Sequence, residues 1–415
     1  MDSGTFAWAV TAGALVLFMT PGLAFFYGGL VKAKSVISMM MMSFGSMALI
    51  GVLWVLYGFN MAAVGDPFQF AGNPFVEGFA LNGLGESDLV LAFFGATFAI
   101  ITVALISGAI ADRAKFGSWL IFAGLFATLV YFPVAAWVWG GGWIQNLGSL
   151  LGFDVTVLDY AGGTAVHINA GAAALALALV LGKRIGFAKG AHTPHNPPFV
   201  LLGAAILWFG WFGFNGGAEA AWAYGDGVYG SLTADGTFIG TIVVNTLVAP
   251  AAAVIGWLIV EKLKDGKATS IGAASGAVTG LVAITPACAF LDPFWALVLG
   301  VVSGVISALA IELKFKLGFD DSLDVVGIHL VAGLVGTLWL GFFAKGTGLV
   351  FSGSFEQLAV QAIAAFGVMI YSFIVAFVIG FVIEKTIGFR VKNEDELAGI
   401  DTVVHGEEGY VLDAK

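Results

Sequence analysis

His167-Ile168-Asn169-Ala170-Gly171 and His329-Leu330-Val331-Ala332-Gly333 share one pattern, in which Ala-Gly follows a histidine after two intervening residues. Each copy lies deep inside an apolar stretch long enough to cross a membrane. An ionisable side chain at membrane depth is costly, so it faces the protein interior or a water-filled cavity and marks a functional site. Two copies in matching local sequence predict one site built twice.

The composition indicates a polytopic membrane protein. The chain has 415 residues, of which 59% are hydrophobic and 11% charged, whereas a soluble domain carries about 25% charged residues. Because about 20 apolar residues cross the hydrocarbon core as a helix, we predict an all-α protein with eleven membrane-spanning helices. The eleven charge-free runs are 3–31, 35–65, 89–111, 116–153, 160–182, 190–218, 236–260, 268–291, 293–311, 325–344 and 357–383.

The basic residues predict the orientation of these spans. With the N-terminus outside, all but one of the 17 Lys and Arg residues fall on the cytoplasmic side, and the exception is Lys345. Cytoplasmic loops of membrane proteins are enriched in Lys and Arg. We therefore expect a cytoplasmic (inner) membrane protein with its N-terminus outside and its C-terminus inside. No basic residue precedes the first span, which argues against a cleaved signal peptide.

The two histidine motifs lie in spans five and ten, which run in opposite directions. Motifs of opposite polarity indicate an inverted repeat, whose substrate site lies between the halves. The expected repeats are about 1–185 and 198–345, followed by one long C-terminal helix. The alternative is a chance match in Gly- and Ala-rich helices. We predict a transporter domain over residues 1–389. A cytoplasmic tail is expected over 390–415, which is too short to bury a core of its own.

Aromatic residues gather at the outer ends of spans three to six. Phe94 and Phe98 lie four apart and share a helix face, Trp139 ends span four, and Trp211 opens the segment that runs to Gly217. Aromatic faces beside a carboxylate suit a small cation, because ring quadrupoles replace part of its hydration. The alternative for each ring is an interfacial or core position. Their joint presence above buried histidines favours a route for a cation.

Two carboxylates precede the histidine-bearing spans. Asp159 begins span five, where it either faces the cation or caps the helix and complements its dipole, and we favour the structural and electrostatic role. Asp324 has a parallel position before span ten, and we assign it to the inner mouth and the packing there.

The sequence predicts neither a cofactor nor a metal. A single cysteine, Cys288, excludes internal disulfides and cysteine metal sites. His192 and His195 share a Pro-rich cytoplasmic loop, but two histidines without a third ligand are more often simply exposed. We expect neither an enzyme nor a nucleic-acid partner.

These residues resemble the Amt/Rh ammonium transporter family along the whole chain. The most specific block is Asp159-Tyr160-Ala161-Gly162-Gly163-Thr164-Ala165-Val166-His167, and Lys183-Arg184 follows it. The other matching segments are Phe25 to Val31, Ile110 to Arg113, Trp211 to Asn215, Ile284 to Ala287 and Asp324 to His329.

The resemblance implies a homotrimer with a separate ammonium and methylammonium pore in each subunit. It places Phe98, Trp139 and Ala218 at an outer recruitment site, which Asp159 shapes from behind. It further implies a gate of two stacked rings, a pair of pore histidines and supporting residues around them. The gate is Phe98 with Phe214, the pore pair is His167 with His329, and the supporting residues are Phe94, Trp211 and Asp324.

The C-terminal segment resembles the regulatory tail of the same family. The matching positions include Arg390, Glu394, Asp401 and His405. The resemblance implies control by a cytoplasmic PII (GlnK-type) signalling protein. A disordered tail is the alternative.

The sequence also departs from the family pattern. Ala218 stands where a Ser is common, so aromatic and electrostatic effects must carry more of the outer binding. Leu330 replaces a Gly, Tyr160 replaces a Phe, and the loop 144–158 is long. Glu219, next to Ala218, either compensates for the missing Ser or faces water.

The predicted function is electrogenic ammonium transport. Deprotonation at the outer site removes most of the cost of desolvating the ion, neutral ammonia crosses the pore, and the proton crosses separately. The alternatives are an electroneutral ammonia channel, an ammonium-sensing receptor that signals through its tail, and a sodium-coupled carrier. The last would require helices unwound at mid-membrane, which the sequence does not clearly show.

Overall fold

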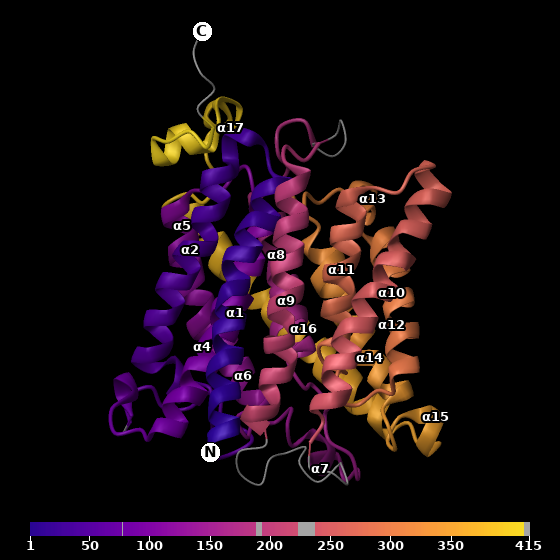
Figure 1. The fold of residues 1–415 in the computed structure, drawn as a ribbon. Helices are drawn as coiled ribbons and strands as arrows, with labels where there is room; N and C mark the ends of the chain where they lie inside the picture. Colours follow the sequence, from indigo (N-terminus) through magenta and orange to yellow (C-terminus); the bar gives the residue numbers. More distant parts are fainter. Residues whose placement is uncertain (77, 188–192, 223–236, 411–415) are drawn as a thin grey trace.

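The structure, a computed structural model, describes residues 1–76, 78–187, 193–222 and 237–410. Among these residues the fold is all-helical, and the one strand-like pairing is an isolated bridge between Ala114 and Arg390. Predicted features at His192 and at the last five residues of the tail lie outside the described ranges. Figure 1 shows the helices side by side in one bundle, with the N-terminus and the C-terminal tail at opposite ends.

The described residues contain ten helices long and apolar enough to cross a membrane. Several of them combine consecutive helical segments, in which an α-helix adjoins a π-helical turn, a 3₁₀ turn or a further short α-helix. The principal α-helical parts are α1 (Ser3–Leu30), α2 (Val36–Leu53), α4 (Glu86–Ile106), α5 (Phe116–Phe126) with α6 (Phe132–Val138), α8 (Asn169–Leu181), α9 (Pro197–Trp222), α10 (Ile239–Asp265), α12 (Pro293–Ala310), α14 (Ala332–Phe343) and α16 (Glu356–Thr386).

The eighth predicted span differs from its prediction. The charge-free run 268–291 forms helix α11 over Ser270–Ile284, which has 15 residues, whereas each of the ten membrane-length helices, taken with its adjoining helical turns, has at least 18. It ends just before Thr285-Pro286. Thr285 still has helical backbone angles, and Pro286 has no N–H to continue the helical hydrogen bonds. The remaining helices are short, namely α3 (Phe59–Met61), α7 (Leu147–Leu151) within the long outer loop, α13 (Leu313–Leu317), α15 (Leu349–Ser352) and α17 (Asn393–Ala398).

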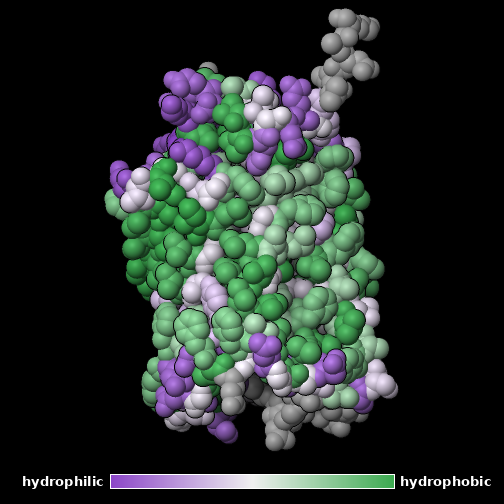
Figure 2. Space-filling view, turned by 90° about the vertical axis from the view of Figure 1, so that its left-hand side faces the viewer, coloured by the Kyte–Doolittle hydropathy of each residue, from purple (hydrophilic) through white to green (hydrophobic). Residues whose placement is uncertain are grey.

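The surface carries a broad apolar band. In Figure 2 hydrophobic residues cover the middle of the molecule, and hydrophilic residues gather at its two ends. Exposed large side chains such as Phe209, Ile255 and Ile370 contribute to the apolar surface. A band of this kind matches the hydrocarbon core of a bilayer, so the chain is a multi-pass membrane protein.

Small residues allow the helices to approach closely. Gly203 on α9 lies against the backbone of Gly22 and Phe26 on α1, and Gly300 and Gly304 on α12 face the backbone of α10. In lipid, helix association depends on such close packing, because lipid tails are as apolar as the side chains.

Candidate functional site

The two histidines meet at the centre of the bundle. His167 belongs to the π-helical turn Gly163–Ile168 that leads into α8, and His329 belongs to the π-helical turn Val326–Val331 that leads into α14. Their Nδ1 atoms lie 3.2 Å apart, and their rings stack at 5.3 Å with planes 22° apart. Both side chains are at most 2% exposed. The structure therefore brings together the residues that the paired motifs predict to form one site.

The glycine of each motif explains how the histidines approach one another. Gly171 packs on the backbone of Leu330, and a Cβ there would lie 2.5 Å from the Leu330 nitrogen. Gly333 packs on Ile168, where a Cβ would lie 3.1 Å from Cγ1. Because the later residue of each motif meets the earlier part of the other, the two helices cross in antiparallel fashion at the histidines.

The protonation of the pair follows from its geometry. Two imidazole Nδ1 atoms form a hydrogen bond only when one carries a proton and the other accepts it. Among the described residues, Nε2 of His167 has no hydrogen-bond partner. The two histidines line a narrow, otherwise largely apolar lumen. The volume that the centre of a water molecule can occupy there is about 10 Å³, which is about the minimum for one water molecule.

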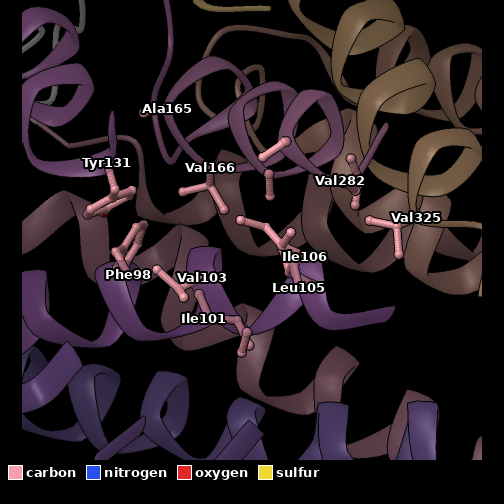
Figure 3. Close-up of a cluster of buried hydrophobic side chains, with 14 of the residues drawn as sticks. Phe98, Ile101, Val103, Leu105, Ile106, Tyr131, Ala165, Val166, Val282 and Val325 are labelled. Atoms are coloured by element: carbon pink, nitrogen blue, oxygen red, sulfur yellow. The ribbon is translucent and has the colours of Figure 1, made fainter. Parts of the chain in front are cut away.

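Two stacked phenylalanines close one end of this lumen. The rings of Phe98 and Phe214 lie 4.1 Å apart with planes 14° apart. Phe214 lines the histidine lumen and lies 6.2 Å from the His167 ring, whereas Phe98 lines a second, wider cavity. Figure 3 shows Phe98 beside Tyr131 at one end of a cluster of buried apolar side chains that continues to Val325. The stacked pair therefore separates the two cavities.

The wider cavity, here called the vestibule, has a volume of about 400 Å³. The Trp139 ring meets Phe98 edge-on at 6.1 Å, and Phe94 contacts Phe98 at 4.8 Å. Further lining residues include Tyr160 and Ala218. The vestibule is thus a largely aromatic chamber beside the stacked Phe98 and Phe214 rings, and aromatic faces of this kind attract small cations.

Asp159 binds the backbone amides at the start of the helix that carries His167. Its fully buried carboxylate accepts hydrogen bonds from the amides of Gly162, Gly163, Thr164 and Ala165, at 2.6 to 3.1 Å. These are the amides at the start of the π-helical turn, which the helix itself leaves without partners. The indole of Trp139 donates to the Asp159 carbonyl at 2.8 Å. Asp159 therefore fixes both the start of the His167 helix and one wall of the vestibule.

Comparisons with known proteins identify the family. A model of the Ammonium Transporter Family matches residues 7–410. The chain belongs to the ammonium transporter family. An ammonium transporter of Mycobacterium tuberculosis is 49% identical over 452 residues, with 99% of this chain and 90% of the relative covered. "Ammonium transporter Amt1" of Archaeoglobus fulgidus is 38% identical, with 99% and 100% covered.

Two solved structures share the fold. A protein described as "Sensor Amt Protein" superposes with a TM-score of 0.84 at 26% identity, covering 97% of this chain and 98% of that one. The crystal structure of Candida albicans Mep2 superposes with a TM-score of 0.82 at 30% identity, covering 95% and 88%.

The inner end of the ammonium transporter site contains the counterpart of Asp159. Asp321 precedes His329 by eight residues, as Asp159 precedes His167, and it accepts from the Val326 amide at 2.7 Å. Asp324, which the sequence places in the parallel position, instead pairs with Lys314 at 2.5 Å at the inner mouth. The sequence signal that could have identified Asp321 as the counterpart of Asp159 is the shared spacing of eight residues to the histidine.

A buried ion-pair cluster ties the inner ends of the helices together. Arg184 binds Asp320 through both Nε and Nη2 at 2.9 Å, and its Nη1 reaches Asp112 at 3.0 Å. Arg113 donates to the Ser322 hydroxyl at 2.5 Å. Sequence analysis used these basic residues for orientation and for the family resemblance, and it did not predict their pairing.

The tail packs on the inner ends of the ammonium transporter helices. Asp401 accepts from the amides of Ile37 and Ser38 at the start of α2, at 3.0 and 2.8 Å. Arg390 pairs with Glu396 at 2.7 Å, and Glu396 also accepts from the Ile185 amide. His405 meets the Phe116 ring at 5.4 Å. Glu394, a predicted tail residue, is exposed, and the buried carboxylate is Glu396.

Trp211 supports the pore pair. Its ring stacks on His167 at 5.5 Å, and its indole nitrogen donates to the Thr285 hydroxyl at 2.8 Å.

Glu219 also has a partner that sequence reasoning missed, because its carboxylate accepts from the Tyr160 hydroxyl. The residues are far apart in sequence, so no local pattern reveals that contact.

Proposed function

We propose that this chain transports ammonium across a membrane through the lumen that the two histidines line. The observation that carries the proposal is the pair His167 and His329, held 3.2 Å apart in an apolar lumen directly behind the stacked Phe98 and Phe214 rings. The family membership supports ammonium and methylammonium as substrates.

The proposed mechanism separates the ion into ammonia and a proton. Taking an intact ammonium ion through the dry lumen costs several kcal/mol of lost hydration. The aromatic vestibule binds the ion, and deprotonation there leaves neutral ammonia to pass the phenylalanine gate. The imidazoles both donate and accept hydrogen bonds, so they replace water for ammonia inside. Potassium has no proton to lose, and the lumen rejects it.

Transport is proposed to be electrogenic because a titratable pair lines the narrow lumen behind the stacked phenylalanines. A proton shared between the two Nδ1 atoms offers a route that is separate from the route of ammonia. An electroneutral ammonia channel is the rival mechanism. The measurement that separates them is the charge moved for each methylammonium accumulated.

The proposed setting is an eleven-span subunit of a homotrimer in the cytoplasmic membrane, with the N-terminus outside. A count of eleven spans requires that α11, which has 15 residues, crosses the membrane together with the turn that follows it. The placement of Lys and Arg at the tail end of the bundle supports this orientation. The homotrimer follows from the family resemblance.

Regulation by a PII-type protein is proposed for the tail. Its contacts with the start of α2 and with Ile185 link it to the inner ends of spans that form the transport path. A sensing role is the second candidate, since a solved structure of similar fold is described as "Sensor Amt Protein". Under the sensing alternative, signalling through the tail would be the primary activity.

Uptake of methylammonium by proteoliposomes tests the proposal. We expect saturable uptake that potassium does not inhibit, and that survives deletion of residues 391–415. Absence of uptake by the full chain would contradict transport, and uptake that needs the tail would favour the sensing role.

A further inference from the structure

Glu219 lies at the edge of the vestibule, next to Ala218, which lines it. Its side chain is half-buried, and both carboxylate oxygens are held from outside α9. Oε1 accepts from the Phe238 amide at 2.9 Å, and Oε2 accepts from the Tyr160 hydroxyl. Two donors from separate segments therefore fix the position of a negative charge beside the vestibule.

Tyr160 connects that charge to the vestibule. Its fully buried ring lines the cavity and meets Phe238 and Phe290 edge-on at 6.1 and 5.6 Å. In this packing the hydroxyl donates to the Glu219 carboxylate. A hydroxyl that donates to a carboxylate becomes a stronger acceptor, because hydrogen bonds in a chain polarise one another. The ring also becomes more electron-rich, so its face attracts a cation more strongly.

The neighbouring groups make this charge important for a cation in the vestibule. Ala218 presents a methyl group, which offers an ammonium ion no acceptor. The carboxylate of Asp159 accepts from four backbone amides, which spread and neutralise much of its charge. Glu219 accepts one backbone amide and one phenol, so more of its charge is directed through Tyr160.

We infer that Glu219, acting through the Tyr160 hydroxyl, sets the affinity of the vestibule for ammonium and small primary amine cations. Glu219 is thus a positioning residue for recruitment, and Tyr160 is the wall residue through which its charge acts on the cavity. The inference rests on the proposed transport function, because it concerns the first step of that function. The charge that favours recruitment is then the Glu219 carboxylate, which lies behind the vestibule wall.

The test compares the kinetics of methylammonium uptake in proteoliposomes containing the full chain. Glu219→Gln keeps a hydrogen-bonding side chain of the same shape and removes the charge. Tyr160→Phe keeps the ring and removes the hydroxyl. The matched control is Glu86→Gln, which removes the same charge from an exposed position in the first turn of α4.

We expect KM to rise about five- to tenfold in Glu219→Gln and in Tyr160→Phe, the size expected for losing one nearby charge at a partly hydrated site. The maximal rate should stay within about twofold, because the gate and the histidines are unchanged. The double variant should resemble either single variant, since the two groups act as one unit. KM in Glu86→Gln should equal that of the wild type.

Two results from the glutamate variants would overturn the inference. One is an unchanged KM in Glu219→Gln beside saturable wild-type uptake, which leaves the transport function standing. The other is an equal rise in KM for Glu86→Gln, which assigns the effect to general surface charge. If Glu219→Gln does not reconstitute, Tyr160→Phe alone decides, and an unchanged KM there overturns the inference as well. Absence of wild-type uptake contradicts the transport function itself.

Discussion

The Nδ1 atoms of His167 and His329 lie 3.2 Å apart, although the residues are 162 positions apart in the chain. The contact joins two π-helical turns that cross where Gly171 meets Leu330 and Gly333 meets Ile168. Since one nitrogen must donate and the other accept, the imidazoles work as a pair that shares a proton.

Removal of both imidazoles should abolish discrimination against potassium. In the variant His167→Ala with His329→Ala, the lumen loses its polar groups and gains room for water, so hydrated cations gain a path. We expect potassium to inhibit or replace methylammonium current in electrical recordings on reconstituted protein.

The control for this variant is Val278→Ala, which widens the same lumen without removing a polar group. Wild-type selectivity in the double histidine variant would show that the pair has a purely structural role.

Gly171→Ala should be more harmful than Gly333→Ala. The added Cβ at position 171 meets the backbone of Leu330 at 2.5 Å, whereas at position 333 the nearest atom is Cγ1 of Ile168 at 3.1 Å. Backbone cannot move aside as a side chain does, so we expect Gly171→Ala to lose about 1–3 kcal/mol of stability and to separate the histidines. Gly333→Ala should lose less than about 1 kcal/mol, because alanine favours a helix.

Thermal unfolding in detergent, paired with methylammonium uptake, provides the comparison. Equal losses in the two glycine variants would contradict the crossing described above.

Asp320→Asn should destabilise the inner end at neutral pH. Burial opposes the charge of Asp320, but its bonds with Arg184 outweigh burial and hold the pKa of Asp320 below its ordinary value. The stabilisation is therefore present above the ordinary value near 3.8 and is lost only as pH falls through the lower value. Removing one partner of a buried pair costs about 3–5 kcal/mol.

The control is Asp292→Asn, which breaks the half-exposed pair with Lys345 and should cost less than about 1 kcal/mol. The melting temperatures in detergent at pH 7 give the comparison, and similar losses in both variants would refute the prediction.

Asp321 should make stability depend on pH between about 4 and 6. Burial raises the pKa of its carboxyl from 3.8 to about 6. A raised pKa of an acid favours its neutral form in the folded state, so this stabilisation is complete below about 4 and is lost as pH rises through about 6.

Asp321→Asn removes the charge and keeps an oxygen for the Val326 amide. Relative to the wild type, the variant should gain about 1–3 kcal/mol between pH 5 and pH 8. Melting temperatures of the two proteins at both pH values measure the gain. A difference that stays constant with pH would argue against the raised pKa.

The pattern of charges predicted most of the fold, because a charge inside the bilayer is too costly to place at random. It placed His167 and His329 in spans, and the shared His-x-x-Ala-Gly pattern predicted that they meet. The length of α11 was not predictable from charge alone, since the run 268–291 contains no charge yet its helix ends before Pro286.

Contacts between distant segments required the structure. The pairing of Glu219 with Tyr160 depends on how the end of α9 meets the loop before His167, and no periodicity encodes that distance. Likewise, Asp324 attracted attention by its proximity to His329, whereas the position equivalent to Asp159 is Asp321, eight residues before the histidine. Glu396 rather than Glu394 is buried in the tail, since the turn there decides which side chain faces inward.

The most direct test of the account measures charge and methylammonium together in proteoliposomes containing the full chain. We predict one positive charge moved for each methylammonium accumulated, with the coupling lost in the variant His167→Ala with His329→Ala. Saturable uptake without any charge movement, at every methylammonium concentration, would contradict the account.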